Sequence, residues 1–103
     1  MTDKNNMSLS VADLSRALQS SCPPCVLDVR EPHEVDKVPF PGARCIPLSS
    51  LQQNYMSLDD TKEWVILCHH GYRSMQATLF LKSNGFNKVR NITGGIDAWS
   101  LEV

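Results

Sequence analysis

Residues 64–74 read Trp-Val-Ile-Leu-Cys-His-His-Gly-Tyr-Arg-Ser, and this stretch decides the fold. Its first four residues are apolar and lie between polar segments, which predicts a buried strand at 64–67. Residues 75–83 have the pattern of a helix, and the Asn-Gly pair at 84–85 is typical of a left-handed helix end. Cys68 therefore stands at the carboxyl end of a buried strand, in a loop that leads into a helix.

Strands and helices alternate on both sides of this stretch. We expect the other strands at 7–9, 26–29, 43–46 and 89–92. We expect the other helices at about 10–20, at 47–54 and, after a turn at 93–95, near 96–99. Residues 30–34 are polar and indicate a turn. The alternation predicts an α/β fold with a central, mainly parallel sheet of four to five short strands and helices on both faces. Ligands of such sheets bind at the carboxyl ends of strands, which is where Cys68 lies.

The totals fit one compact domain over residues 1–103, with its core at about 9–99 and a flexible N-terminus at 1–6. Ten Lys and Arg against eleven Asp and Glu give a net charge of −1, which excludes the basic excess of nucleic-acid-binding proteins. No segment approaches the roughly 20 apolar residues that cross a bilayer, and the beginning of the chain lacks a signal-peptide pattern. We expect a cytoplasmic protein without a nucleic-acid or membrane partner.

The loop after Cys68 has the residues of an anion-binding cradle. If the loop curls, its backbone N–H groups point inward and the following helix adds about half a positive charge, which favours the reactive thiolate. Gly71 suits a backbone that needs a positive φ or a close approach, and Arg73 supplies a fixed cation. The plainer interpretation is a buried structural cysteine followed by two surface histidines, His69 and His70.

The chain resembles a single-domain rhodanese from about Leu9 to Trp99, because six landmarks stand in that family's order. They are Val26-Leu27-Asp28-Val29-Arg30-Glu31, Pro41-Gly42-Ala43, Ile46-Pro47-Leu48, the loop from Cys68 to Arg73, Gly85-Phe86, and Gly94-Gly95-Ile96-Asp97-Ala98-Trp99. The resemblance implies a sulfurtransferase that takes a sulfane sulfur from thiosulfate or a related donor as a Cys68 persulfide. It implies transfer to cyanide or to a thiol, which includes a protein thiol. The chain has no cofactor motif.

The resemblance also implies the site residues, with Cys68 as the catalytic nucleophile. The implied substrate-binding residues are His69, His70, Gly71, Tyr72 and Arg73. Asp28 and Arg30 match the family's Asp-x-Arg element, which supports the active-site side of the sheet; the plainer interpretation is a surface ion pair. Arg30 and Arg73 together are expected to make the mouth of the site cationic. The chain departs from the family at Pro39-Phe40, where the family usually has a histidine and an isoleucine.

Two other functions compete with sulfur transfer by an enzyme. One is a partner-binding or persulfide-relay module with little turnover of its own, because a carrier uses the same cysteine chemistry. The other is a phosphatase or arsenate reductase. Related phosphatases have five residues between the cysteine and the arginine, whereas this chain has four, and the smaller ring suits a single sulfur atom.

The remaining cysteines and His33 have plainer interpretations. Cys22 and Cys25 form a Cys-Pro-Pro-Cys pair, but the pair precedes a strand, whereas redox pairs of the thioredoxin kind open a helix after one. A second Cys-x-x-Cys is absent from the sequence, so we expect no metal site. Cys45 is expected to pack in the core, and His33 is expected to be a solvated turn residue.

Overall fold

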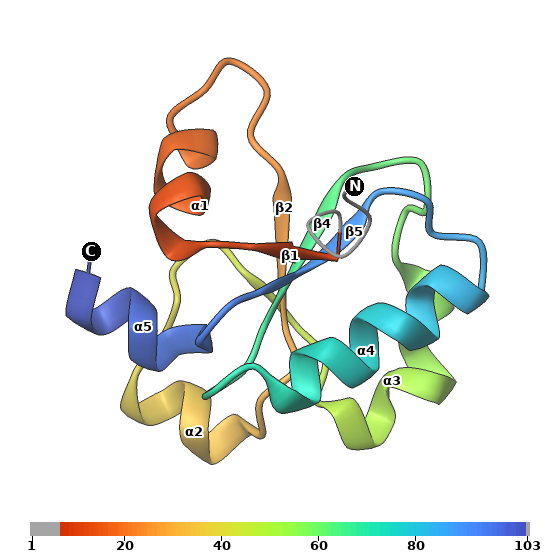
Figure 1. The fold of residues 1–103 in the computed structure, drawn as a ribbon. Coiled ribbons are helices and arrows are strands. Elements are labelled where there is room, and N and C mark those ends of the chain that lie inside the picture. The colour runs from red at the N-terminus through yellow and green to blue at the C-terminus, as the bar shows by residue number, and fades with distance from the viewer. Residues whose placement is uncertain (1–6, 103) are drawn as a thin grey trace.

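A sheet of five parallel strands forms the centre of the part that a computed structural model of the chain describes, residues 7–102 (Figure 1). The proposed flexible N-terminus, 1–6, lies outside the described residues, as does residue 103. The strands are β1 (Ser8–Leu9), β2 (Cys25–Asp28), β3 (Arg44–Cys45), β4 (Trp64–Leu67) and β5 (Val89–Ile92). They lie in the order β1-β5-β4-β2-β3, and every neighbouring pair is parallel. The predicted parallel α/β sheet is confirmed.

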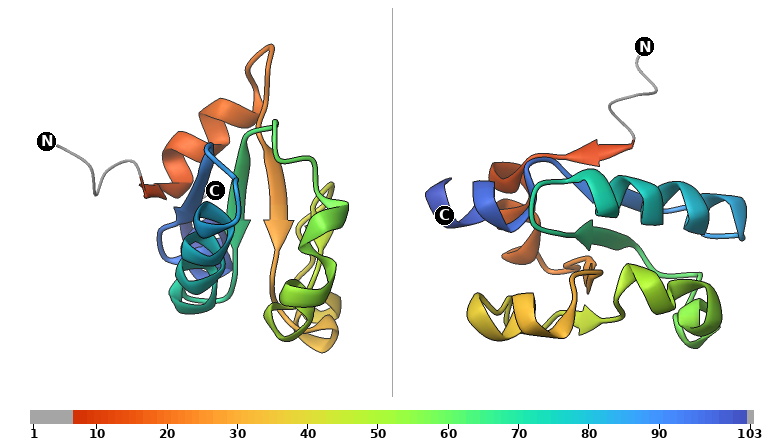
Figure 2. Two further views of the ribbon diagram at one scale, coloured as in Figure 1. Left: turned by 90° about the vertical axis from the view of Figure 1, so that its right-hand side faces the viewer. Right: turned by 90° about the horizontal axis from the view of Figure 1, so that it is seen from below.

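Helices cover both faces of this sheet, as predicted. They are α1 (Val11–Leu18), α2 (Pro32–Lys37), α3 (Leu48–Asn54), α4 (Tyr72–Ser83) and α5 (Gly95–Glu102), with a 3-10 turn η2 (Tyr55–Ser57) after α3. Helices α1 and α5 lie on one face and contact each other, and α3 and α4 lie together on the other (Figure 1). The left view of Figure 2 looks onto the second face, with α4 toward β5 and α3 toward β2. Helix α2 lies at the carboxyl end of the sheet.

Strand β4 is buried on both faces, which explains its unbroken apolar run. Trp64 and Ile66 point into the layer under α3 and α4, whereas Val65 and Leu67 point into the layer under α1 and α5. All four side chains are at most 6% exposed. The two layers hold β4 on both sides. Cys68, the residue after β4, therefore has a fixed position at the carboxyl end of the sheet.

Two local predictions are wrong. The polar segment at 30–34 is not a turn, because α2 begins at Pro32; Glu31 and Glu34 form a capping box there, and Pro32 occupies the first turn. Helix α2 buries none of its residues, so it lacks the apolar spacing that indicates a helix. Cys45 is not in the core but exposed, because β3 is a two-residue strand at the edge of the sheet. His33 is solvent-exposed, but on α2.

Candidate active site

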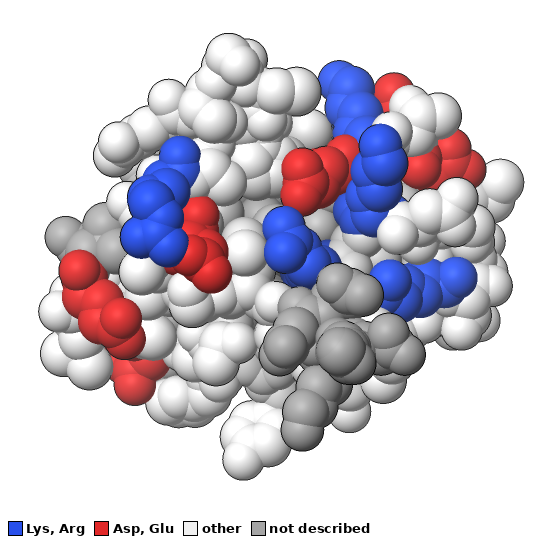
Figure 3. Space-filling view, turned by 45° about the horizontal axis from the view of Figure 1, so that its top comes forward, with Lys and Arg blue, Asp and Glu red and all other residues white. Residues whose placement is uncertain are grey.

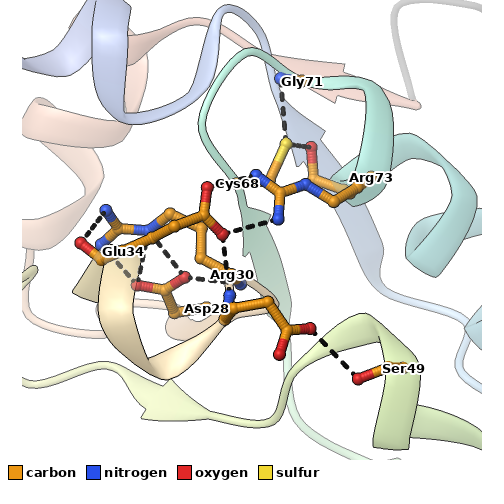
Figure 4. A network of polar contacts seen from close by, with 9 residues as sticks. Asp28, Arg30, Glu34, Ser49, Cys68, Gly71 and Arg73 are labelled. Atoms are coloured by element: carbon orange, nitrogen blue, oxygen red, sulfur yellow. Dashed lines mark hydrogen bonds and ion pairs between the residues drawn. The ribbon is translucent and has the colours of Figure 1, made fainter. Parts of the chain in front are cut away.

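Cys68 is the buried centre of the site, with 1% of its surface exposed. The Gly71 amide donates a hydrogen bond to Cys68 Sγ at 3.0 Å, and the Cys68 thiol donates to Ser74 Oγ at 3.3 Å (Figure 4). Within the described residues, Gly71 is the one residue whose backbone amide donates a hydrogen bond to Cys68 Sγ. The sulfur therefore meets polar groups at the end of β4, rather than hydrocarbon alone.

The loop is shorter than the sequence suggested, because α4 begins at Tyr72 rather than at Met75. Gly71 is the N-cap residue and has a φ of 109°, a conformation that residues with a side chain rarely adopt. The first helical hydrogen bond runs from the Met75 amide to the Gly71 carbonyl at 3.2 Å. Cys68 Sγ consequently lies at the N-terminus of a 12-residue helix, where the backbone dipoles favour negative charge.

The start of α5 holds the other side of the loop. The Ile96 amide donates to the Cys68 carbonyl at 2.8 Å, and the Asp97 amide donates to the His69 carbonyl at 3.2 Å. Gly95 must lack a side chain here, because a Cβ atom would lie 2.3 Å from the Cys68 carbonyl oxygen. These contacts turn the two carbonyls toward α5 and fix the orientation of the peptide groups beside the sulfur.

Arg73 forms a bidentate ion pair with Glu34 of α2, and both of its bonds are 2.7 Å long (Figure 4). The hydrogen bond from Arg73 is the main cause that lowers the pKa of Glu34 from 4.5 to about 2. The same bond raises the pKa of Arg73. The charge that was expected to face the substrate is thus paired with a carboxylate, and the pair joins α2 to the first turn of α4.

Asp28 and Arg30 form a buried ion pair, not a surface one, since they are 0% and 2% exposed. Arg30 Nη2 donates to Asp28 Oδ2 at 2.7 Å and to the Val38 carbonyl at 2.8 Å. The pair therefore ties the end of β2 to the residue that follows α2. Because Arg30 and Arg73 each have a carboxylate partner, the expectation that they make the mouth of the site cationic is wrong.

Three of the predicted substrate-binding side chains lie on the surface around the cysteine. His69 and His70 stack with ring centroids 4.0 Å apart, and each ring has a nitrogen within 3.8 Å of an Asp97 carboxylate oxygen. Tyr72 is 83% exposed. The structure therefore brings the backbone of Gly71 to the sulfur, whereas His69, His70 and Tyr72 form an outer rim.

A cleft of about 270 Å³ opens beside the loop, between α2 and the start of α5. Its lining residues are Arg30, His33, Glu34, Lys37, Val38, His69 and Ile96. Two of the charged side chains in this lining, Arg30 and Glu34, already form ion pairs. The third, Lys37, takes part in none of the ion pairs among the described residues. A small anion is the ligand that this lining favours.

The Cys-Pro-Pro-Cys pair lies away from Cys68, and the described residues include neither a metal-binding cluster nor a membrane-spanning helix. Cys22 is exposed and Cys25 is half-buried at the amino end of β2, the opposite end of the parallel sheet from Cys68. Within residues 7–102, no group of three or more His, Cys, Asp and Glu side chains is placed to hold a metal ion. No described helix is long and apolar enough to cross a membrane.

Sequence reasoning missed two buried polar residues at the site. Ser74, in the first turn of α4, and Asn91, in β5, are 0% and 5% exposed, and the Ser74 hydroxyl donates to Asn91 Oδ1. The available signal was a polar residue inside the otherwise buried strand at 89–92. It was weak, because strand patterning does not show which helix residue lies opposite.

Fold and site together define a class: α/β proteins that hold a cysteine at the carboxyl end of a central parallel strand, at the N-terminus of the next helix. Within this class, the model of the family described as the rhodanese-like domain matches residues 10–102. The chain belongs to this family.

Individual relatives agree with the family assignment. The chain is 34% identical to the putative sulfurtransferase YtwF of Bacillus subtilis over 94 residues, which cover 91% of this chain and 90% of YtwF. It is 39% identical to the putative sulfur carrier protein YrkF of the same organism over 75 residues, or 73% of this chain, but it spans only 40% of YrkF. The crystal structure of a rhodanese-related protein from Thermoplasma volcanium has a TM-score of 0.86 and 33% identity, with 93% of this chain and 92% of that one covered.

The Glu34–Arg73 pair makes stability depend on pH in the acid range. The pKa of Glu34 is lowered from 4.5 to about 2 in the folded protein. The contribution of Glu34 to the free energy of unfolding is therefore complete above pH 4.5 and is lost as the pH falls toward 2. Both side chains are partly solvated, so we expect Glu34→Gln to cost about 1 kcal/mol at pH 7, or a Tm about 4–8 °C lower. Thermal unfolding of both proteins from pH 7 to pH 2 should show this difference shrink below pH 4.5. Glu63→Gln, which breaks the more exposed Arg90 pair, is the control. An undiminished Tm difference at pH 2 would contradict the assignment.

Gly95 lies so close to the Cys68 carbonyl that a side chain there should cost more stability than backbone strain alone. Gly95→Ala places a Cβ atom 2.3 Å from the Cys68 carbonyl oxygen, so the loop has to move. Gly42→Ala is the matched control, because Gly42 also has a positive φ, of 85°, but no atom within 4 Å of its Cβ position. We expect a cost of about 1 kcal/mol for Gly42→Ala and at least twice that for Gly95→Ala, measured by urea unfolding. Equal losses would show that the contact with the loop is unimportant.

Proposed function

We propose that this protein is a sulfurtransferase that carries a sulfane sulfur on Cys68 as a persulfide. The observation that carries the proposal is the position of Cys68 Sγ at the N-terminus of α4, within 3.0 Å of the Gly71 amide. Cys68 is the proposed catalytic residue, and residues 69–73 are the proposed substrate-binding loop. Asp28 and Arg30 act as supports, since they anchor α2 beside that loop.

The proposed reaction has two displacements. The Cys68 thiolate attacks the outer sulfur of the donor, a new S–S bond forms, and the bond to the rest of the donor breaks, so that the leaving group departs with the electron pair. A nucleophilic acceptor then attacks the same sulfur, and the electron pair returns to Cys68 Sγ. The Gly71 amide and the dipole of α4 stabilise negative charge on sulfur in both steps.

We propose thiosulfate or a related sulfane-sulfur compound as donor, and cyanide or a thiol as acceptor. The lining of the cleft supports an anionic donor, because Lys37, His33 and His69 lie there beside the loop. The four residues between Cys68 and Arg73 support a ring sized for one sulfur. We assign the reaction to the cytoplasm, where a reducing environment keeps thiols free.

A second candidate is a relay that accepts sulfur and passes it to a partner protein without turnover of small molecules. The similarity to a putative sulfur carrier protein over 73% of this chain favours it. The burial of Cys68, at 1% exposure, also fits a sulfur that is released only to a docked acceptor.

Mass spectrometry after incubation with thiosulfate tests both candidates. Trypsin releases Cys68 in peptide 63–73, which holds no other cysteine. We expect this peptide to gain one sulfur atom that a reductant removes, and we expect thiocyanate to form when cyanide is added. Cys68→Ser should abolish both results with the fold retained, whereas Cys22→Ser, Cys25→Ser and Cys45→Ser should leave them nearly intact.

The outcomes separate the alternatives. Sulfur on Cys68 without thiocyanate would favour the relay. Cys68-dependent hydrolysis of an aryl phosphate, without any sulfur gain, would overturn the proposal in favour of a phosphatase. Loss of sulfur transfer in Cys22→Ser or Cys25→Ser would show that the Cys-Pro-Pro-Cys pair takes part.

A further inference from the structure

A line of three polar side chains runs from Cys68 into the core. The Cys68 thiol donates to Ser74 Oγ at 3.3 Å, and the Ser74 hydroxyl donates in turn to Asn91 Oδ1. Each residue is at most 5% exposed, and dashed lines in Figure 4 mark the contacts of the Cys68 sulfur with the Gly71 nitrogen and with a hydroxyl oxygen. The sulfur thus contacts a backbone donor, the Gly71 amide, and a side-chain hydroxyl, that of Ser74.

The place of this pair in the core is unusual for polar groups. Asn91 points to the same face of β5 as Val89, which packs under α4 with Ala77 and Leu81. Burying an amide and a hydroxyl there costs desolvation energy that their hydrogen bond offsets only in part, and an apolar pair of similar shape would stabilise the core about as well. Packing alone therefore does not explain why Ser74 and Asn91 are polar.

Proton counting shows what the pair can do for the sulfur. The Ser74 hydroxyl has one proton. While Cys68 is a thiol, that proton serves Asn91 and the Ser74 oxygen accepts from sulfur, an arrangement that fits the Sγ–Oγ and Oγ–Oδ1 contacts. When Cys68 is a thiolate, it has no proton to donate, and the hydroxyl can turn and donate to Sγ instead. The Asn91 side chain has both an acceptor and a donor, so a flip of its amide gives Ser74 a partner in either state.

We propose that Ser74 is a second catalytic residue, which donates a hydrogen bond to Cys68 Sγ whenever that sulfur is negative, and that Asn91 is its positioning residue. The inference rests on the proposed sulfur transfer. In the first displacement the hydroxyl stabilises the attacking thiolate. In the second, the acceptor forms a bond to the outer sulfur, the S–S bond to Sγ breaks, and the hydroxyl receives Sγ as it takes back the electron pair.

The pH dependence of Cys68 alkylation tests the inference without any sulfur donor. Iodoacetamide reacts with the thiolate, and modification of peptide 63–73 reports Cys68 separately from the other cysteines. A hydrogen bond to a charged group contributes enough for about a tenfold change in an equilibrium. Ser74→Ala should therefore shift the alkylation midpoint upward by about one pH unit, and should slow persulfide formation about tenfold at pH 7. That rate difference should vanish at a pH where both proteins are ionised.

Thr78→Val is the matched control. Thr78 is also fully buried on α4, one turn further from the cysteine, and its hydroxyl donates to the Ser74 carbonyl at 2.8 Å instead of to sulfur. We expect this variant to lose stability but to keep the wild-type alkylation midpoint. Ser74→Thr retains a hydroxyl at this position, so its alkylation midpoint should match that of the wild type and not that of Ser74→Ala.

If the unpaired Asn91 prevents Ser74→Ala from folding, the double variant Ser74→Ala/Asn91→Val removes both polar groups and carries the same prediction. An unchanged midpoint in a folded variant without the Ser74 hydroxyl would overturn the inference, as would an equal shift in Thr78→Val. Because iodoacetamide needs no sulfur transfer, failure here differs from failure of the proposed function, in which wild-type Cys68 would gain no sulfur from thiosulfate.

Discussion

The hydrogen bond from the Gly71 amide to Cys68 Sγ is the interaction on which the site depends. It requires β4 to end at residue 67, a backbone reversal within three residues, and a helix that starts at Tyr72. The positive φ of Gly71 provides the reversal, and the burial of β4 on both faces fixes where it begins. The local geometry at the sulfur is therefore a consequence of the layered packing of the whole sheet.

Two helices that are distant in sequence brace this geometry from outside. Helix α5 donates backbone amides to the carbonyls of Cys68 and His69, and α2 holds Arg73 through Glu34. Helix α2 buries no residue of its own, so polar contacts to Arg30 and Arg73 supply its attachment. An element attached in this way is the part of the site whose position is most open to change by solvent conditions or by a bound partner.

The sequence was sufficient for the sheet, for most of the helices and for the position of the cysteine, because apolar runs and glycine turns are local signals. It was insufficient for α2, which has capping residues but no apolar stripe, and for Cys45, whose exposure depends on β3 being an edge strand. The partners of long-range polar contacts could not be predicted from the sequence either. Arg73 pairs across 39 positions with Glu34, and Ser74 pairs across 17 positions with Asn91, and no periodicity encodes such contacts.

Figure 3 shows, on the side toward the amino ends of the strands, that most basic side chains lie beside acidic ones, and the same balance holds at the active site. Arg30 and Arg73 are each paired with a carboxylate. The groups that touch Sγ are the backbone amide of Gly71 and the buried hydroxyl of Ser74, and both are uncharged dipoles. Uncharged dipoles at a buried sulfur are screened little by salt, whereas the attraction of an anion by Lys37 in the open cleft weakens as the salt concentration rises. Under the proposed sulfur transfer, stabilisation of the sulfur and attraction of its donor fall to different groups, so that changes at the cleft would alter donor selection while the chemistry at Cys68 stays the same.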